Sequence, residues 1–331
     1  MLKLRYRDGC SWGCLFTEVV RGILLARVLF GARLDEFLVS LKGESKMSQA
    51  MNEKEVRYDR AKGMLWGLIV GDCLGSPIQF SGKDAHPWIT EMEVCPVFGL
   101  PPGYWTDDGS MALCIMDSYV RKGGYDLRDV GATFVKWLRE GYLSSVEGKA
   151  FDVGGATYDG VEAIARGSLV NGEEESQGNG SLMRFAPSYL IARAEGRDEI
   201  LHEVSDLTHA SRKVRAVCDE MAGILDQHIK GIRFTDATAA KVPRAKVPNS
   251  GWAVDTLEAA KWAFVTTQTF EEGMIAAVNL GGDSDSIGAV YGQLAGAYYG
   301  YAAIPPQWVK AIKTSQAINQ RIDDFLTALG M

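Results

Sequence analysis

Two short acidic clusters carry the residues best suited to chemistry in this chain. Residues 281–286 read GGDSDS, and residues 105–109 read WTDDG. Each cluster offers at least three residues with side-chain oxygen donors, and neither contains His or Cys. Such a donor set suits hard divalent cations. Because four carboxylates brought together repel one another unless cations lie between them, the pair of clusters predicts a metal site.

Helix capping is the ordinary explanation for each cluster taken alone. Thr106 or Asp107 could cap a helix running through residues 111–119, and Ser284 or Asp285 could cap one through residues 288–299. For a single cluster this structural explanation is favoured. Two clusters, each with more carboxylates than one cap needs, favour the cation site instead.

Other sites that use paired aspartates fail on spacing. An EF-hand loop starting at Asp283 would need oxygen at its fifth position and Glu at its twelfth, where this chain has Ile287 and Leu294. A phosphatase with an aspartate nucleophile needs a buried strand before the motif, and residues 278–280 are too short for one. The chain has four histidines and no HExxH, which argues against a zinc hydrolase.

The elements that must position these clusters are expected to be helices. Residues 126–139, 210–230, 254–264 and 270–278 carry apolar side chains at three- and four-residue spacing. Period-two alternation is scarce, and residues 234–251 have the composition of a loop. We therefore predict an all-α fold.

Glycines recur every four residues in two of the expected helices, and each set lies on one stripe: Gly63, Gly67, Gly71 and Gly75, and Gly288, Gly292, Gly296 and Gly300. Glycine costs about 1 kcal/mol relative to Ala at each interior helix position, so close approach of two backbones must offset that cost. The first helix ends near Asp72 and the second begins near Asp285. We predict a packed pair that holds the metal site at its ends; the alternative is a glycine-rich buried strand at residues 67–70.

Composition narrows the class of protein. The chain has 331 residues, 47% hydrophobic and 23% charged, which allows one large domain or two ordinary ones. A net charge of -7 argues against binding nucleic acid or an anionic membrane. Six cysteines without zinc-like spacing or a secretory signal indicate reduced thiols and a cytoplasmic protein. No apolar run reaches the roughly 18 residues of a membrane span.

Residues 1–50 differ in character from the rest of the chain. One helical pattern covers residues 15–41, a polar stretch covers residues 42–46, and Met47 and Met51 come directly after it. Either the true protein starts at one of these methionines, or the segment is an extension that covers the active site or packs on a partner.

Taken in order, several motifs of this chain resemble the ADP-ribosylglycohydrolase family, of the dinitrogenase-reductase-activating type. Residues 178–184, GNGSLMR, open with glycines whose N–H groups can cradle phosphate oxygens. The resemblance runs from about residue 57 to 325 and rests on the segments GDCLG (71–75), GYWTDD (103–108), DVG (152–154), GNGS (178–181), LTH (207–209) and GGDSDS (281–286).

The resemblance implies a single all-α domain over residues 55–328 with two Mg²⁺ or Mn²⁺ ions in a cleft. By motif position the metal ligands would be Thr106, Asp107, Asp108, Asp283, Asp285 and Ser286. The groups around bound ADP-ribose would be Gln79, Asp152, Gly154, Gly178, Asn179, Gly180, Ser181, Met183, His209 and Gly282. Catalysis would fall to Asp107, Asp108 and Asp152, with the metal ions activating a water.

Two positions depart from the family pattern. The family usually has Thr where this chain has Ser286, which keeps the hydroxyl ligand. Many members have a Glu where this chain has Gln79, and an amide cannot accept a proton at neutral pH. This makes a serine-linked substrate less expected than an arginine-linked one.

The function predicted from the resemblance is metal-dependent hydrolysis of the N-glycosidic bond in ADP-ribosylated protein, with ADP-ribosyl-arginine as the expected linkage. The alternative is an immunity or binding protein that occludes an ADP-ribosyltransferase toxin, with weak or no hydrolysis. In both cases the partner is a protein, and neither nucleic acid nor membrane is expected.

Overall fold

The computed structural model describes the backbone of residues 33–331 and the side chains of residues 53–331. The chain divides into two units, Met1–Glu55 and Val56–Met331, and both acidic clusters belong to the second. Much of the predicted extension, residues 1–50, lies outside the described residues, so its proposed roles stay predictions. Helix α2 (Arg33–Gly75) runs through the polar stretch at residues 42–46 without interruption.

Helices make up the regular structure of residues 33–331, which contain no strand and only two isolated bridges. This confirms the predicted all-α fold. After α2 come η1 (Ser76–Ile78), α3 (Asp107–Lys122), α4 (Leu127–Glu140), α5 (Gly155–Ala165), η2 (Asn179–Ser181), α6 (Phe185–Glu195), α7 (Glu199–Asp206), α8 (Arg212–His228), η3 (Ala239–Lys241), η4 (Arg244–Lys246), α9 (Ala253–Thr266), α10 (Phe270–Val278), α11 (Ser284–Tyr299), η5 (Tyr301–Ala303), α12 (Pro306–Ala311) and α13 (Ser315–Ala328).

The helices predicted from apolar spacing form where expected. Helix α4 is an example: Asp126 caps it by accepting a hydrogen bond from the Asp129 backbone N–H, and Gly141 ends it in the left-handed conformation. Residues 234–251, expected to be a loop, contain only the short η3 and η4 turns. In these segments the local pattern was sufficient because capping and amphipathic burial agree.

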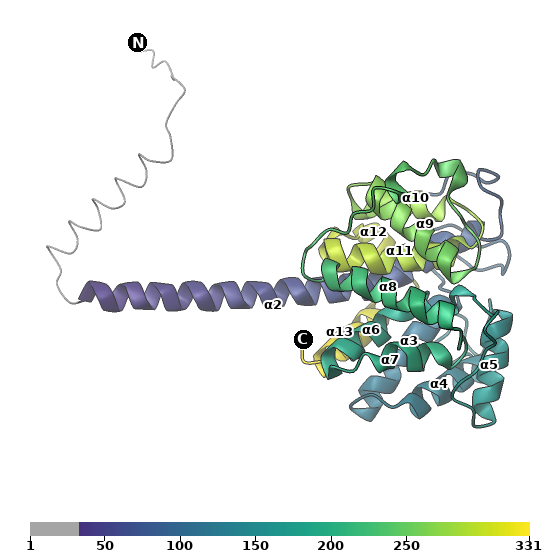
Figure 1. The fold of residues 1–331 in the computed structure, drawn as a ribbon, viewed down its shortest axis with the longest axis horizontal. Coiled ribbons are helices and arrows are strands. Elements are labelled where there is room, and N and C mark those ends of the chain that lie inside the picture. Colours follow the sequence, from purple (N-terminus) through teal and green to yellow (C-terminus); the bar gives the residue numbers. More distant parts are fainter. Residues whose placement is uncertain (1–32) are drawn as a thin grey trace, which may run out of the picture. The chain divides into compact units, whose positions relative to one another are not determined.

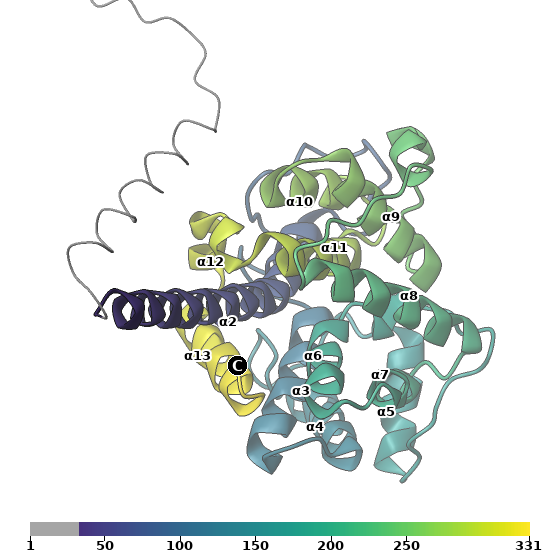
Figure 2. The same cartoon turned by 60° about the vertical axis from the view of Figure 1, so that its left-hand side comes forward.

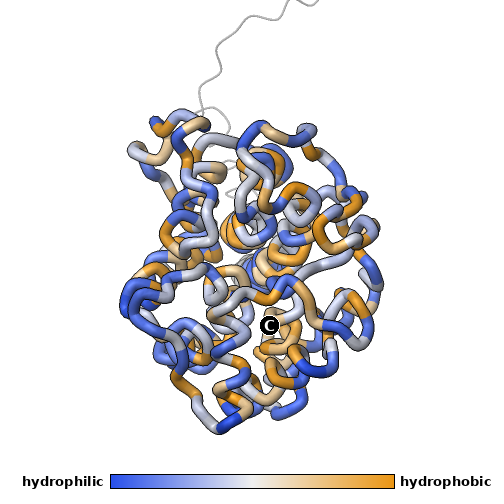
Figure 3. Tube along the Cα trace, turned by 90° about the vertical axis from the view of Figure 1, so that its right-hand side faces the viewer, coloured by the Kyte–Doolittle hydropathy of each residue, from blue (hydrophilic) through white to orange (hydrophobic). Residues whose placement is uncertain are grey.

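Within Val56–Met331 the helices form two groups (Figures 1 and 2). Helix α11 packs against α8, α9 and α10, whereas α3 packs against α4, α6 and α13. Hydrophobic segments recur toward the middle of the view in Figure 3, and hydrophilic segments lie mostly along its outline. No helix in residues 33–331 has the length and apolar character needed to cross a membrane.

The two glycine stripes meet, as predicted, and form a seam between α2 and α11. A Cβ atom added to Gly67 would lie 2.1 Å from the Gly292 carbonyl oxygen, and one added to Gly71 would lie 2.0 Å from that of Gly288. Real Cβ atoms do not approach backbone so closely, so only glycine allows this packing. The strand alternative at residues 67–70 is wrong. The seam fixes the C-terminal end of α2 beside the start of α11.

Candidate active site

The acidic clusters lie at the N-termini of α3 and α11, at the end of the seam. Asp107 and Asp108 form the first turn of α3, Asp283 precedes α11 and Asp285 lies in its first turn. Thr106, one of the two residues expected to cap α3, is its N-cap residue, whereas the N-cap residue of α11 is Asp283 and not Ser284 or Asp285 as expected; neither N-cap residue makes a side-chain capping hydrogen bond. No carboxylate of the cluster therefore acts as a side-chain cap at the start of α3 or α11.

Asp72 of α2 holds the start of α3 in its place. Its carboxylate accepts hydrogen bonds from the backbone N–H groups of Thr106 and Gly109 and from the Thr106 hydroxyl, at 2.9 to 3.0 Å. Ser284 donates a hydrogen bond to the Gly75 carbonyl across the same seam. Sequence reasoning left Asp72 out of the site, although an acidic residue on a buried glycine-rich helix was a signal.

Buried carboxyl groups in the cluster disfavour one another's ionisation. Burial, and then the charges of neighbouring carboxylates, raise the pKa of Asp107, Asp108 and Asp285 well above the ordinary range. Burial also raises the pKa of Asp283. Positive charge placed among these groups would restore their ionised forms.

The donor set fits a hard divalent cation. Ser286 Oγ lies 3.5 Å from Asp108 Oδ1, while Asp108 Oδ2 is buried with no hydrogen-bond partner. A buried carboxylate oxygen without a partner is costly unless something satisfies it. No three His, Cys, Asp or Glu side chains in residues 53–331 already converge as a metal-binding group, so the two-metal centre stays a prediction.

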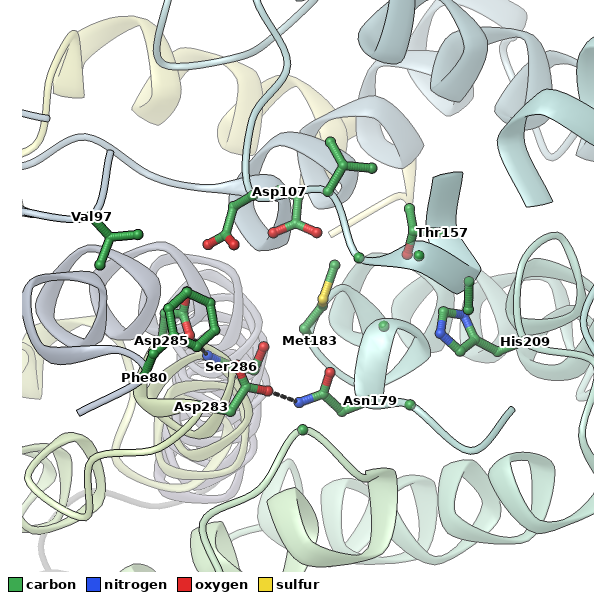
Figure 4. Close-up of a pocket in the computed structure, with 18 of the residues that line it drawn as sticks. Phe80, Val97, Asp107, Thr157, Asn179, Met183, His209, Asp283, Asp285 and Ser286 are labelled. Carbon is green, nitrogen blue, oxygen red and sulfur yellow. Dashed lines mark hydrogen bonds between the residues drawn. The ribbon is translucent and has the colours of Figure 1, made fainter. Parts of the chain in front are cut away.

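A pocket of about 570 Å³ opens over the acidic cluster, within the size range of small-molecule sites. Figure 4 shows the Asp283, Asp285 and Ser286 side chains on one side and His209 with Thr157 on the other. Eleven of the predicted site residues line it: Asp107, Asp152, Gly154, Gly178, Asn179, Gly180, Met183, His209, Asp283, Asp285 and Ser286. One pocket thus brings together segments from most of the chain's length.

Five predicted site residues do not line this pocket. Thr106 and Asp108 belong to the acidic cluster and are buried. Ser181 hydrogen-bonds the Ser205 hydroxyl. Gly282 has a φ of 65°, and a Cβ atom there would meet the Asn249 carbonyl oxygen at 2.0 Å, so its glycine shapes the turn before α11.

Gln79 is the fifth of these, and it is buried next to the site. Neither amide atom has a hydrogen-bond partner of normal geometry among residues 53–331. The amide is nevertheless close enough to Asp152 to lower the pKa of that carboxyl, against the larger effect of burial, which raises it.

Asp152 itself has a φ of 56°, a left-handed conformation that costs a non-glycine residue about 1–3 kcal/mol. Such strain is typical of functional residues.

Apolar residues on the pocket wall were missed by sequence reasoning. Phe80, Val97 and Phe98 line the pocket, and the Phe80 side chain is 64% exposed. Phe80 N–H donates to the Gly282 carbonyl, which attaches this rim to the acidic turn. These residues lie in irregular segments without a motif, so the sequence carries no signal for them. Val153, Gly155, Ala156, Thr157 and Gly251 complete the lining.

Asn179 connects the two sides of the pocket. Its side-chain amide donates to Asp283 Oδ2 and, at 2.9 Å, to the Thr256 hydroxyl. The hydrogen bond to Asp283 ties the η2 loop to the N-terminus of α11. The loop and the acidic cluster are therefore held in one arrangement by a direct contact.

Comparison with known proteins gives this pocket a family. The ADP-ribosylglycohydrolase family model matches residues 53–330, which include both clusters and every residue lining the pocket. The chain belongs to the ADP-ribosylglycohydrolase family. This membership confirms the predicted family and the predicted enzyme class, an ADP-ribosylhydrolase.

Several known proteins are similar to this chain over most of their length. The ADP-ribosylarginine hydrolase Tri1 of Pseudomonas putida (strain GB-1) is 36% identical, over 80% of this chain and 77% of that protein. Tri1 of Serratia proteamaculans (strain 568) is 34% identical, over 79% and 77%. The ADP-ribosyl-[dinitrogen reductase] glycohydrolase of Rhodospirillum rubrum is 28% identical, over 83% and 98%. A solved ADP-ribosylglycohydrolase-related protein complex aligns with a TM-score of 0.71 at 34% identity, over 83% of this chain and 99% of that one.

Proposed function

We propose that this protein is a metal-dependent hydrolase that removes ADP-ribose from arginine side chains of modified proteins. The carrying observation is the pocket in which buried carboxylates from two helix N-termini face a glycine-rich loop and His209. The arginine linkage is supported by two relatives, 36% and 34% identical, that are named ADP-ribosylarginine hydrolases.

The acidic cluster would hold two Mg²⁺ or Mn²⁺ ions. Their ligands would be oxygen atoms of Thr106, Asp107, Asp108, Asp283, Asp285 and Ser286. Bound there, divalent cations supply positive charge that orients ribose hydroxyls and polarises water. Asp72 would act indirectly, since its hydrogen bonds fix Thr106 and the first turn of α3.

The carboxylates suit the reaction at the ribose C1 atom. Cleavage of the C1–N bond passes through an oxocarbenium-like state, whose positive charge the surrounding anionic side chains would stabilise. Water adds its oxygen to C1 and gives its proton to a carboxylate, for which Asp107 and Asp152 are the candidates because both line the pocket. The electron pair of the broken C1–N bond stays on the guanidine nitrogen, and the proton that water gave to the carboxylate passes to the guanidine, so that arginine departs as a guanidinium cation, which an acidic pocket favours.

The other side of the pocket would bind the nucleotide part of the substrate. Gly178, Asn179 and Gly180 line it together with Met183 and His209. Gln79 lies apart from these residues, beside Asp152. Its amide would hydrogen-bond the substrate or Asp152 without exchanging a proton, consistent with a reaction whose base is a carboxylate.

Release of ADP-ribose from an arginine-ADP-ribosylated protein in the presence of Mg²⁺ tests the proposal. The wild type is expected to release it, and Asp283→Ala is expected to lose the activity. Asp324→Ala, at an exposed aspartate on α13, is the matched control and should keep the activity. Release that survives Asp283→Ala would overturn the metal-site assignment. Release only from a serine-linked substrate would overturn the arginine assignment.

A further inference from the structure

A fully buried arginine lies behind the pocket without an ionic partner. Arg184 is 1% exposed and forms no salt bridge among residues 53–331. One terminal nitrogen, Nη1, contacts Met111 Sδ at 3.5 Å, and the guanidinium lies 5.1 Å from the centre of the Phe134 ring. The other, Nη2, donates a hydrogen bond of 2.6 Å to the Thr208 hydroxyl. Burial of so costly a charge suggests a task for its directed N–H groups.

Thr208 passes the contact on to His209. Its hydroxyl oxygen lies 2.7 Å from His209 Nδ1, and Thr208 is wholly buried. Arginine has no acceptor atom, so the hydroxyl must accept from Arg184. The hydroxyl proton then needs an acceptor, and among the described residues only His209 Nδ1 lies within reach. The opposite arrangement, with Nδ1–H donating, would leave a buried O–H unsatisfied at a cost of about 1–3 kcal/mol.

This direction of hydrogen bonding determines the form of the imidazole. With Nδ1 accepting, a neutral imidazole carries its proton on Nε2. Burial, followed by the charge of Arg184, lowers the pKa of His209 to about 3, so the ring is neutral at ordinary pH. His209 lines the pocket, and Nε2 has no hydrogen-bond partner within residues 53–331.

The glycine-rich loop is shaped around this nitrogen. A Cβ atom at Gly178 would lie 3.2 Å from His209 Nε2, and one at Gly180 would lie 3.0 Å from Nε2 and 2.5 Å from Cε1. Any larger residue at position 180 would displace the ring. The two glycines therefore leave space for the Nε2 edge of the imidazole at the pocket wall, where Figure 4 shows His209 beside Thr157.

We propose that Arg184 and Thr208 are positioning residues that hold His209 as its Nε2–H tautomer, so that the imidazole presents a fixed hydrogen-bond donor to a phosphate or ribose oxygen of ADP-ribose. The ligand part of this inference rests on the proposed function, whereas the tautomer follows from the hydrogen bonds alone. Because Arg184 can only donate a hydrogen bond to the Thr208 hydroxyl, that hydroxyl must in turn donate to His209 Nδ1, which leaves the proton of the neutral ring on Nε2.

His228 provides an internal reference of the opposite kind. Its Nδ1 lies 2.8 Å from the Leu294 carbonyl oxygen, which can only accept, and its Nε2 accepts from the Phe234 N–H at 3.2 Å. His228 is therefore expected as the Nδ1–H tautomer. The chain has only four histidines, which keeps a ¹⁵N-histidine NMR spectrum simple to assign with His209→Gln and His228→Gln variants.

The experiment measures the ring ¹⁵N shifts and N–H couplings of the full chain, together with ADP-ribose binding by calorimetry. In the wild type we expect protonation of Nε2 in His209 and of Nδ1 in His228. Thr208→Val removes the hydroxyl at nearly constant size; it should abolish the single Nε2–H state and weaken ADP-ribose binding about tenfold, the effect of one hydrogen bond. Thr208→Ser keeps the hydroxyl and should restore both.

Three results would overturn the inference or separate it from the proposed function. Protonation of Nδ1 in wild-type His209 would refute the relay. Wild-type binding by Thr208→Val, with an unchanged tautomer, would show that Thr208 only fills space. The predicted tautomer in a wild type that does not bind ADP-ribose would uphold the relay and refute both the ligand part and the proposed function.

Discussion

The glycine seam, between α2 and α11, and the acidic cluster, at the N-termini of α3 and α11, share helix α11 but have opposite energetics. Along the seam, α2 and α11 lack side chains, and their backbones come closer than any Cβ atom would allow. At the end of the seam, four carboxyl groups at the N-termini of α3 and α11 are buried together. Burial raises the pKa of all four, and the charges of neighbouring carboxylates raise the pKa of three of them further. The comparison indicates a division of tasks: the seam supplies rigidity, and the cluster keeps a costly arrangement for chemistry.

The largest effect should come from removing one charge of the cluster. Asp107→Asn keeps the shape of the side chain, and we expect kcat to fall by about two to three orders of magnitude, the range for losing one group that acts on developing charge. Without metal ions, the free energy of unfolding should rise by about 1 kcal/mol because a buried charge is gone. Steady-state kinetics and denaturant unfolding measure both. Asp159→Asn, at an exposed position on α5, is the control, and an equal loss of kcat there would contradict the assignment.

A methyl group placed in the seam should have the opposite effect on stability, because it lowers the free energy of unfolding. Gly292→Ala puts a Cβ atom 1.9 Å from the Gly67 carbonyl oxygen, and we expect a loss of about 3 kcal/mol in the free energy of unfolding. Gly223→Ala on α8 is the matched control: nothing lies within 4 Å of its added Cβ atom, so it should be neutral or slightly stabilising. Thermal unfolding decides the point, and equal behaviour of the two variants would contradict the close packing.

Without bound metal ions, the buried carboxyl groups of the cluster should make the stability of the folded protein depend on pH. Burial raises the pKa of Asp72 from 3.8 to about 7, and the pKa of Asp107 rises as well. Between about pH 4 and pH 7 these groups are therefore ionised in the unfolded chain but keep their protons in the folded state. The free energy of unfolding of the metal-free protein should fall as pH rises.

Adding Mg²⁺ or Mn²⁺ should reverse that loss at neutral pH. At 100 times its dissociation constant, one bound ion stabilises the folded state by about 2.7 kcal/mol, or roughly 5 °C in the unfolding midpoint. Differential scanning calorimetry with and without chelator, at pH 5 and pH 7.5, checks both statements. A midpoint of the metal-free protein that rises with pH would contradict the predicted fall in stability.

Local patterns in the sequence predicted much of the fold. Apolar spacing gave helices such as α4 and α10, and the four-residue glycine repeat predicted the seam. Helix α2 continues through the polar residues 42–46 because Lys and Glu are good helix formers, so polarity alone does not end a helix.

The candidate site was predicted less completely, for reasons of distance along the chain. Asp72 holds Thr106 from 34 positions away, and a cap supplied by another helix leaves no mark in the local pattern. The apolar rim at Phe80 depends on a backbone hydrogen bond to Gly282, more than 200 positions later. Tertiary contacts of this kind override what a short window can show.

Metal binding itself tests the central claim most directly. Isothermal titration of the chelated, full-length protein with Mn²⁺ should show two sites per chain, and Asp283→Ala combined with Asp285→Ala should remove them while helical content stays unchanged. Undiminished Mn²⁺ binding by the double variant, or no binding by the wild type, would contradict a metal site at the end of the seam.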